Sequence, residues 1–197
     1  MDRIIDIVLP AIPQTLIMVI ASTIIALLIG LPLGIILTTT RPGGLTESLK
    51  VYSVLDGIIN ILRSFPFVIL MIVVFPLSRL IVGKSYGTAA MIIPLSVSAA
   101  PFVARLMEGY LIQVDSGIIE AAKSMGSSKR EIIFKVLIPE AMPMIVTGIT
   151  MTVINVIGYS AMAGVMGGGG LGDVANRYGY QRNEPLILWS AVLVIII

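Results

Sequence analysis

Two glycine-containing stretches of this chain carry residue types that bind phosphate in nucleotide-binding proteins. Gly167, Gly169 and Gly172 have the G-x-G-x-x-G spacing, and Gly83-Lys84-Ser85 resembles the end of a phosphate-binding loop. The first stretch follows a long apolar segment rather than a β-strand, so it lacks the context of a dinucleotide site. The second has Ser78 where a phosphate-binding loop needs its first glycine. We therefore predict no nucleotide site and no cofactor in this chain.

The side chains most often used in catalysis and metal binding are missing. The chain contains no His and no Cys, which removes the commonest general base, the thiolate nucleophile and the commonest metal ligands. The acidic residues lie in loops or at the ends of apolar segments, so a pair of catalytic aspartates within the membrane is not expected. The sequence predicts neither an enzyme nor a metal site.

The composition is that of a membrane protein. Of the 197 residues, 57% are hydrophobic and only 12% are charged, whereas about a quarter of an ordinary soluble domain is charged. The mean hydropathy is +1.03. The net charge is only +2 and the basic residues do not form a cluster, so no nucleic-acid partner is expected. These features predict an integral protein whose surroundings are lipid.

Five apolar segments predict an all-α integral membrane protein with five transmembrane helices in a single domain, residues 1–197. The predicted spans are 12–39, 64–82, 87–107, 141–164 and 185–197. The last is too short to cross about 30 Å of hydrocarbon, which favours a sequence that is incomplete at its end.

Shorter features lie within and between these spans. Gly30, Pro32 and Gly34 mark an expected kink in the first span, and residues 51–63 have the periodicity of an amphipathic helix. The segment 167–184 is expected to be a Gly-rich polar connection. Small residues near Ser96–Ala104 favour close helix packing. Arg105 and Glu108, three residues apart, are expected to form an interfacial ion pair of small energetic worth.

The distribution of basic residues predicts the orientation. If the spans alternate, one side carries seven of them: Arg41, Lys50, Arg105, Lys123, Lys129, Arg130 and Lys135. The other side carries five: Arg3, Arg79, Lys84, Arg177 and Arg182. Because cytoplasmic loops are enriched in Lys and Arg, the first side is predicted to be cytoplasmic and the N-terminus to lie outside.

The polar insert 115–139 is predicted to form two short helices with one apolar side. Asp115 or Ser116 can cap the first helix, which is expected to end near Met125 before a left-handed Gly126. Ser128 and Glu131 have the spacing of a capping box that begins the second helix. That helix is expected to end at Ile138-Pro139. The expected apolar side comprises Ile118, Ile119, Ala122 and Met125 in the first helix and Ile132, Ile133, Val136 and Leu137 in the second. Such an insert rests on the bilayer or docks into a groove of another protein.

The spacing within this insert resembles a known family. Glu120-Ala121-Ala122, then three residues, Gly126, nine residues and Val136-Leu137-Ile138-Pro139, is similar to the EAA loop of ABC importer permeases, EAA-x3-G-x9-I-x-L-P. Val136 and Ile138 depart from that pattern with conserved volume. The stretches 61–67, 94–106 and 158–180 resemble the permease of methionine ABC importers, so the likeness covers most of the chain.

The resemblance implies a fold, an activity and a set of partners. The fold would be that of a type I ABC importer permease in a bacterial cell membrane, and the chain would work as a homodimer. Each copy would engage one of two ATPase subunits, which hold the ATP and Mg, and an extracytoplasmic methionine-binding protein or lipoprotein would deliver substrate. The implied ATPase-coupling residues are Glu120, Ala121, Ala122, Met125, Gly126, Val136, Ile138 and Pro139.

The fourth apolar segment holds the expected pore residues. These are Asn155, Tyr159, Ser160 and Met162, with Met162 as the predicted gate because unbranched Met side chains can close a pore and separate without strain. Ordinary packing of the same residues is the competing interpretation. Two other functions remain open: an importer permease for another amino acid or small zwitterion, and an ATP-independent carrier or scaffold. Co-purification with an ATPase would separate the second from an importer.

Overall fold

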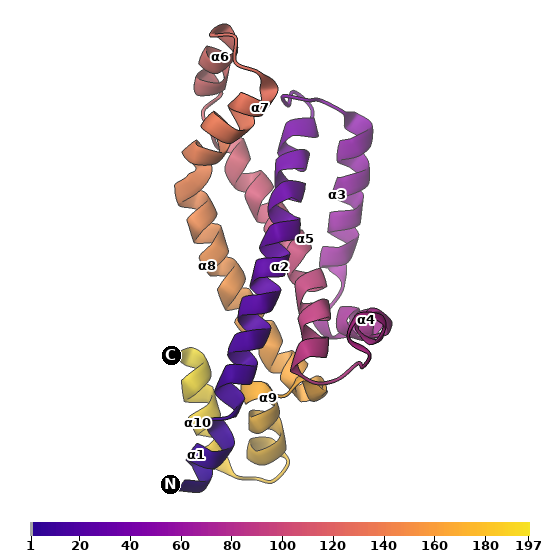
Figure 1. Cartoon of the computed structure of the whole chain (residues 1–197), viewed down its shortest axis with the longest axis vertical. Helices are drawn as coiled ribbons and strands as arrows, with labels where there is room; N and C mark the ends of the chain where they lie inside the picture. Colours follow the sequence, from indigo (N-terminus) through magenta and orange to yellow (C-terminus); the bar gives the residue numbers. More distant parts are fainter. Residues whose placement is uncertain (1) are drawn as a thin grey trace. The chain divides into compact units, whose positions relative to one another are not determined.

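A computed structural model describes residues 2–197, and no β-strand occurs within that range (Figure 1). The chain divides into two compact units. Unit one comprises Met1–Ala26, Phe65–Ala99 and Val153–Ile197; unit two comprises Leu27–Ser64 and Ala100–Thr152. Helices α2, α5 and α8 each contribute residues to both units.

Apolar helices occupy all five predicted segments. They are α2 (Ala11–Thr40), α4 (Phe67–Val82), α5 (Thr88–Ile112), α8 (Ile138–Ala163) and α10 (Pro185–Ile196). In the described chain three helical stretches, Arg3–Thr40, Thr88–Ile112 and Lys129–Gly168, are long and apolar enough to cross a membrane. A fourth span results if α3 (Leu49–Ser64) and α4 form one broken crossing. The helix predicted at 51–63 is confirmed as α3.

In unit two, α2 and α5 approach each other closely at Gly30 and Gly34. A methyl group added at Gly30 would lie 2.6 Å from the carbonyl oxygen of Ala100, and one at Gly34 would lie 2.5 Å from Cβ of Met107. The two glycines are therefore contact points between helices, as small residues four positions apart often are in membranes. Helix α2 continues as one helix through Pro32, and the kink expected there stays a prediction.

The core of unit two joins three helices. Leu37 of α2, Ile59 of α3 and Ala104 of α5 are buried together, and Leu33, Tyr52 and Leu55 pack against them. The small side chain of Ala104 is fully buried, which agrees with the close packing predicted for that stretch.

The second helix of the insert does not end at Pro139, which is a correction to the sequence analysis. Helix α7 (Lys129–Glu131) leads directly into a π-helical turn, η1 (Ile132–Leu137), and then into α8. A proline disrupts an α-helix because it lacks an N–H and its ring meets the carbonyl four residues earlier. Here Ile138 donates to the carbonyl of Ile133, five residues back, so the turn directly before Pro139 is wider than an α-helical turn. We attribute the continuation of the helix to this wider turn.

Unit one has two clusters of buried side chains. In the first, α1 (Asp2–Val8) and α10 pack with α9 (Gly170–Val174) through Val8, Leu171 and Ile187. The second is rich in methionine and aromatic groups: Met18, Phe67, Met71, Met91, Leu95 and Ala163 are buried together.

The segment that the sequence predicted to be a Gly-rich polar connection is folded into short helices. It forms η2 (Gly164–Gly168), α9 and η3 (Ala175–Tyr180). Gly170 has a φ of +75°, a conformation that favours glycine, and a methyl group there would lie 2.6 Å from the hydroxyl oxygen of Thr15. Gln14 and Thr15 accept hydrogen bonds from the backbone N–H groups of Gly170 (2.7 Å) and Leu171 (2.9 Å), so they hold this segment against α2.

Candidate functional site

The insert begins with a capped helix followed by a sharp bend, as predicted. Helix α6 (Ser116–Ser124) starts after Asp115, whose carboxylate accepts a hydrogen bond from the N–H of Gly117 at 2.7 Å. Met125 is the C-cap, and Gly126 follows with a φ of +79°. A side chain at that φ would be strained, so glycine is what allows the chain to turn sharply into α7.

The predicted capping box at the start of α7 is also confirmed. The N–H of Glu131 donates to the hydroxyl of Ser128 at 3.3 Å, and the N–H of Ser128 donates to the carboxylate of Glu131 at 3.1 Å. Lys135 adds an ion pair with Glu131 at 3.0 Å. The bend is thus fixed on both sides by local hydrogen bonds.

The apolar side chains of the insert point in two directions. Ala122, Ile132 and Leu137 are buried, so they form its inward side. Met125 is 78% exposed and Phe134 is 65% exposed, and Ile118 is exposed as well. Met125 and Ile118 are therefore exposed, whereas Ala122, which the sequence placed on the same apolar side, is buried. Phe134 was missed, although a large aromatic residue within a charged insert was a usable signal. Ile118, Met125 and Phe134 are called the docking face below.

Glu120 is exposed, and its spacing from Ile118 places the two residues on opposite sides of α6. Ser116, Ile119, Glu120 and Lys123 follow helical spacing, and all four line a cavity of about 290 Å³ in unit two. The cavity wall is completed by the end of α2, the loop after it and the end of α5: Thr38, Thr39, Arg41, Gly43, Gly44, Leu45, Leu111, Ile112, Val114 and Leu137. The structure thus separates Glu120 from Met125, two residues that were both expected to take part in ATPase coupling.

The remaining predicted coupling residues surround the bend and the π turn. Ala121 is exposed on α6, Val136 lies in η1 and is half-buried, and Ile138 and Pro139 begin α8.

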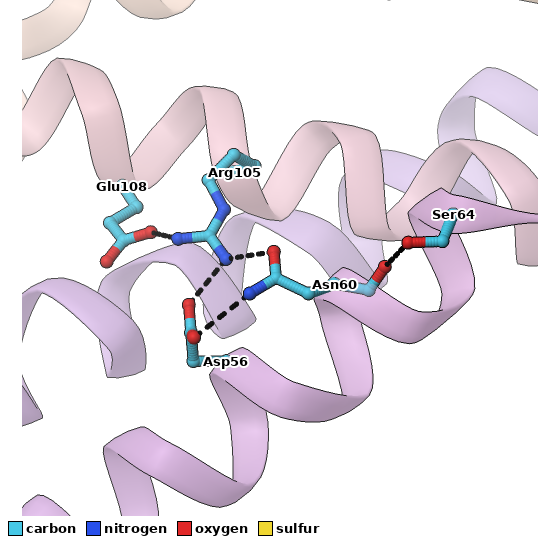
Figure 2. A network of polar contacts seen from close by, with 5 residues as sticks. All are labelled: Asp56, Asn60, Ser64, Arg105 and Glu108. Carbon is cyan, nitrogen blue, oxygen red and sulfur yellow. Dashed lines mark hydrogen bonds and ion pairs between the residues drawn. The ribbon is translucent and has the colours of Figure 1, made fainter.

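A polar network that the sequence only partly indicated connects α3 with α5 (Figure 2). Arg105 pairs with Glu108 at 2.6 Å, which confirms the expected ion pair. It also pairs with Asp56 at 2.5 Å and donates to Asn60 at 2.9 Å, and Asn60 donates to Asp56 at 3.0 Å. Glu108 is only 3% exposed. The network therefore compensates a buried carboxylate and fixes two helices of unit two to each other.

The predicted pore residues occupy different environments in unit one. Ser160 is 2% exposed and donates to the carbonyl of Ile157 at 2.7 Å, so its hydroxyl is used within its own helix. The Tyr159 ring stacks on Phe67 with centroids 4.4 Å apart. Asn155 is half-buried, and Met162 is 48% exposed. Met162 is therefore the member of this set with the most surface to offer another chain or a pathway. Among residues 2–197, no group of three or more carboxylate, His or Cys side chains is placed to hold a metal.

Comparison with known proteins identifies the family. The family model for the binding-protein-dependent transport system inner membrane component matches residues 30–197. The chain belongs to this family. This inner-membrane component is 47% identical to the probable D-methionine transport system permease protein MetI of Vibrio cholerae, over 98% of the chain and 85% of that protein. It is 46% identical to the D-methionine transport system permease protein MetI of Escherichia coli, over 77% of the chain and 70% of that protein.

Solved structures agree in fold. The inner-membrane component superposes on a chain of the inward-facing MetNI methionine ABC transporter with a TM-score of 0.97 and 39% identity, over 100% of this chain and 91% of that one. A second crystal form gives a TM-score of 0.93 and 41% identity, over 95% and 87%. An amino acid ABC transporter matches at 22% identity with a TM-score of 0.75, which shows likeness of fold alone. The predicted all-α fold of type I importer permeases is thereby confirmed.

Proposed function

We propose that this chain is the permease subunit of an ATP-driven importer of methionine. The observation that carries the proposal is the match along the whole chain, at 39% identity, to the membrane chain of the MetNI methionine ABC transporter. The relatives named as D-methionine permeases support the same substrate. ATP and Mg are held by separate ATPase subunits, and this chain supplies the path through the inner membrane.

The insert is the part of the chain that engages the ATPase. Exposed apolar side chains on a short, rigidly capped element are suited to a hydrophobic cleft of a partner, the helix-in-groove mode of recognition. We assign the contact to the docking face, with Met125 and Phe134 as its most exposed members. The residues of the motif form the coupling segment: Glu120, Ala121, Ala122, Met125, Gly126, Val136, Ile138 and Pro139.

The working assembly contains two copies of this chain and two ATPase subunits. A two-fold dimer is the commonest closed arrangement, and it gives each ATPase one insert. The insert faces the cytoplasm and the N-terminus lies outside, which follows from the bias of basic residues. A methionine-binding protein or lipoprotein delivers substrate to the outer face. ATP binding draws the ATPases together, and the inserts pass that movement on as rigid bodies.

The pathway is assigned to the part of α8 that belongs to unit one. Asn155, Tyr159, Ser160 and Met162 are the proposed lining residues, with Met162 at the constriction. Its exposure supports that position, because a gate residue must reach the path rather than pack within its own chain.

Uptake measurements test the substrate and the dependence on ATP. The chain is co-expressed with its ATPase and binding protein in cells that lack methionine import, and uptake of radiolabelled L- and D-methionine is followed. Uptake should require all three proteins and should stop when the nucleotide site of the ATPase is inactivated. Uptake without the ATPase would mean an ATP-independent carrier. Failure of unlabelled methionine to compete, with competition by another amino acid, would reassign the substrate.

A further inference from the structure

The cavity beside α6 is lined by three charged side chains, of which those of Glu120 and Lys123 are exposed and that of Arg41 is half-buried. Arg41, Glu120 and Lys123 all line it, and none of the three forms an ion pair with any residue in the range 2–197. Within the same range, the Nε of Arg41 is buried and has no hydrogen-bond partner. A buried donor without an acceptor costs about 1–3 kcal/mol, so a ligand that accepts a hydrogen bond from this Nε would be favoured.

Several neutral polar groups of the wall are already engaged in hydrogen bonds. The hydroxyls of Thr38 and Thr39 donate to carbonyls of their own helix, both at 2.9 Å. In the loop after α2, the N–H of Gly43 donates to Glu47 at 3.0 Å and that of Gly44 to the carbonyl of Arg41 at 2.9 Å. These bonds occupy part of the polar wall, and the charged side chains remain available to a ligand together with the hydroxyl of Ser116.

The position of the cavity indicates where the ligand comes from. Arg41 directly follows Thr40, where one candidate span ends, and Ile112 of the wall ends another. The wall also includes apolar side chains, among them Leu45, Leu111 and Ile119. A site with cationic donors and an apolar side at the end of two membrane helices suits a lipid headgroup.

The combination of charges selects among headgroups. Two cations can bind a phosphate, with Arg41 supplying paired N–H donors and Lys123 a point charge. The carboxylate of Glu120 would repel a purely anionic headgroup but accepts hydrogen bonds from a primary ammonium. A volume of about 290 Å³ lies at the lower end of the range for small-molecule pockets, which fits a small headgroup. We infer that this cavity binds the phosphoethanolamine headgroup of a membrane phospholipid, with its phosphate at Arg41 and Lys123 and its ammonium at Glu120.

The bound headgroup would connect the end of α2 with α6. It would therefore fix the direction in which the docking face points, without being part of the contact with the ATPase. If the insert faces the cytoplasm, the bound lipid belongs to the inner leaflet, and only this assignment rests on the proposed function. Recognition of the headgroup does not depend on how the chain is oriented in the membrane or on transport of methionine.

Lipid titration of the purified full-length chain, with the subunits that co-purify, tests the inference by native mass spectrometry. Phosphatidylethanolamine, phosphatidylglycerol and phosphatidylcholine with identical acyl chains are compared after delipidation. We expect phosphatidylethanolamine to bind about tenfold more tightly than phosphatidylcholine, whose trimethylammonium has no N–H to donate. Arg41→Gln should weaken phosphatidylethanolamine binding about tenfold, and Arg41→Lys should have an intermediate effect.

Two further variants complete the test. Glu120→Gln should abolish the preference for phosphatidylethanolamine over phosphatidylglycerol. Lys50→Gln, which removes an exposed lysine of α3 outside the cavity, should bind as the wild type does.

Equal binding by wild type and Arg41→Gln, or by phosphatidylcholine and phosphatidylethanolamine, would refute the site. Displacement of the lipid by inorganic phosphate as readily as by soluble phosphoethanolamine would assign the cavity to free anions instead. Since no step measures uptake, failure here and failure of the proposed function are separate results.

Discussion

Replacement of Arg105 by Met should destabilise unit two, because it removes the cation from a network that contains a buried carboxylate. The Arg105 side chain is 26% exposed, that of Asp56 is 30% exposed, and that of Glu108 is only 4% exposed. Removing one partner of a fully buried ion pair costs about 3–5 kcal/mol, whereas an exposed pair is worth about 0–1 kcal/mol. Because one carboxylate is buried and the other is screened by solvent, we expect a loss of about 2–3 kcal/mol. This exceeds the small value that the sequence suggested.

Thermal unfolding of the purified complex measures this loss. For a chain of this size, about 2–3 kcal/mol corresponds to a fall in Tm of about 4–12 °C. Arg63→Met is the matched control, since Arg63 is an exposed arginine at the end of α3 and forms no ion pair with any residue of the described range. It should leave the Tm nearly unchanged.

A double variant separates the buried charge from simple loss of packing. Adding Glu108→Gln to Arg105→Met removes the unpaired carboxylate, so the double variant should be more stable than Arg105→Met alone. If the two effects add, or if Arg105→Met and Arg63→Met lower the Tm equally, then the network does not compensate Glu108 and the reasoning is wrong.

Three further substitutions test the coupling segment, the Gly-rich segment and the proposed gate. Gly126→Val should lower methionine uptake per ATP hydrolysed, because a β-branched residue is strained at a φ of +79°; Gly57→Val, at an open position in α3, is the control. Gly170→Ala should lower the Tm of the complex, because the added methyl group would lie 2.6 Å from a hydroxyl oxygen. Met162→Ala should increase leak of methionine in proteoliposomes without ATP; an equal leak from Met151→Ala, another exposed methionine of α8, would contradict a gate at that position.

The features that the sequence predicted correctly depend on residues close together in the chain. The caps at Asp115 and Ser128 act within three residues, and the bend at Gly126 needs only one, so their types and spacing were sufficient. The amphipathic α3 was likewise visible as a repeat. These local signals also carried the resemblance to importer permeases, because the EAA motif lies within one insert.

The features that the sequence did not reveal depend on distant residues. Asp56 and Arg105 are 49 positions apart, and Gln14 and Gly170 are 156 apart. The residues that surround Asp56 or Gln14 in the sequence do not indicate that Arg105 or Gly170 is the partner. The Gly-rich segment was misread for this reason: alone it has the composition of a loop, and it folds against groups that the start of α2 provides. The exposure of Ile118 and Met125 beside a buried Ala122 was hidden because helical periodicity does not show which residues of the insert another part of the chain covers.

The π turn at Ile132–Leu137 has a consequence for how the insert is aligned with α8. Buried residues recur along α8 at intervals of three or four, as at Ala141, Ile145, Gly148 and Thr152, but Ile132 and Leu137 are both buried and five apart. One surplus residue is therefore accommodated in this turn. Without that residue, everything upstream would be rotated by about 100° about the helix axis, since each α-helical residue advances by that angle. The rotation of the insert about the axis of α8 therefore depends on the one extra residue in this turn.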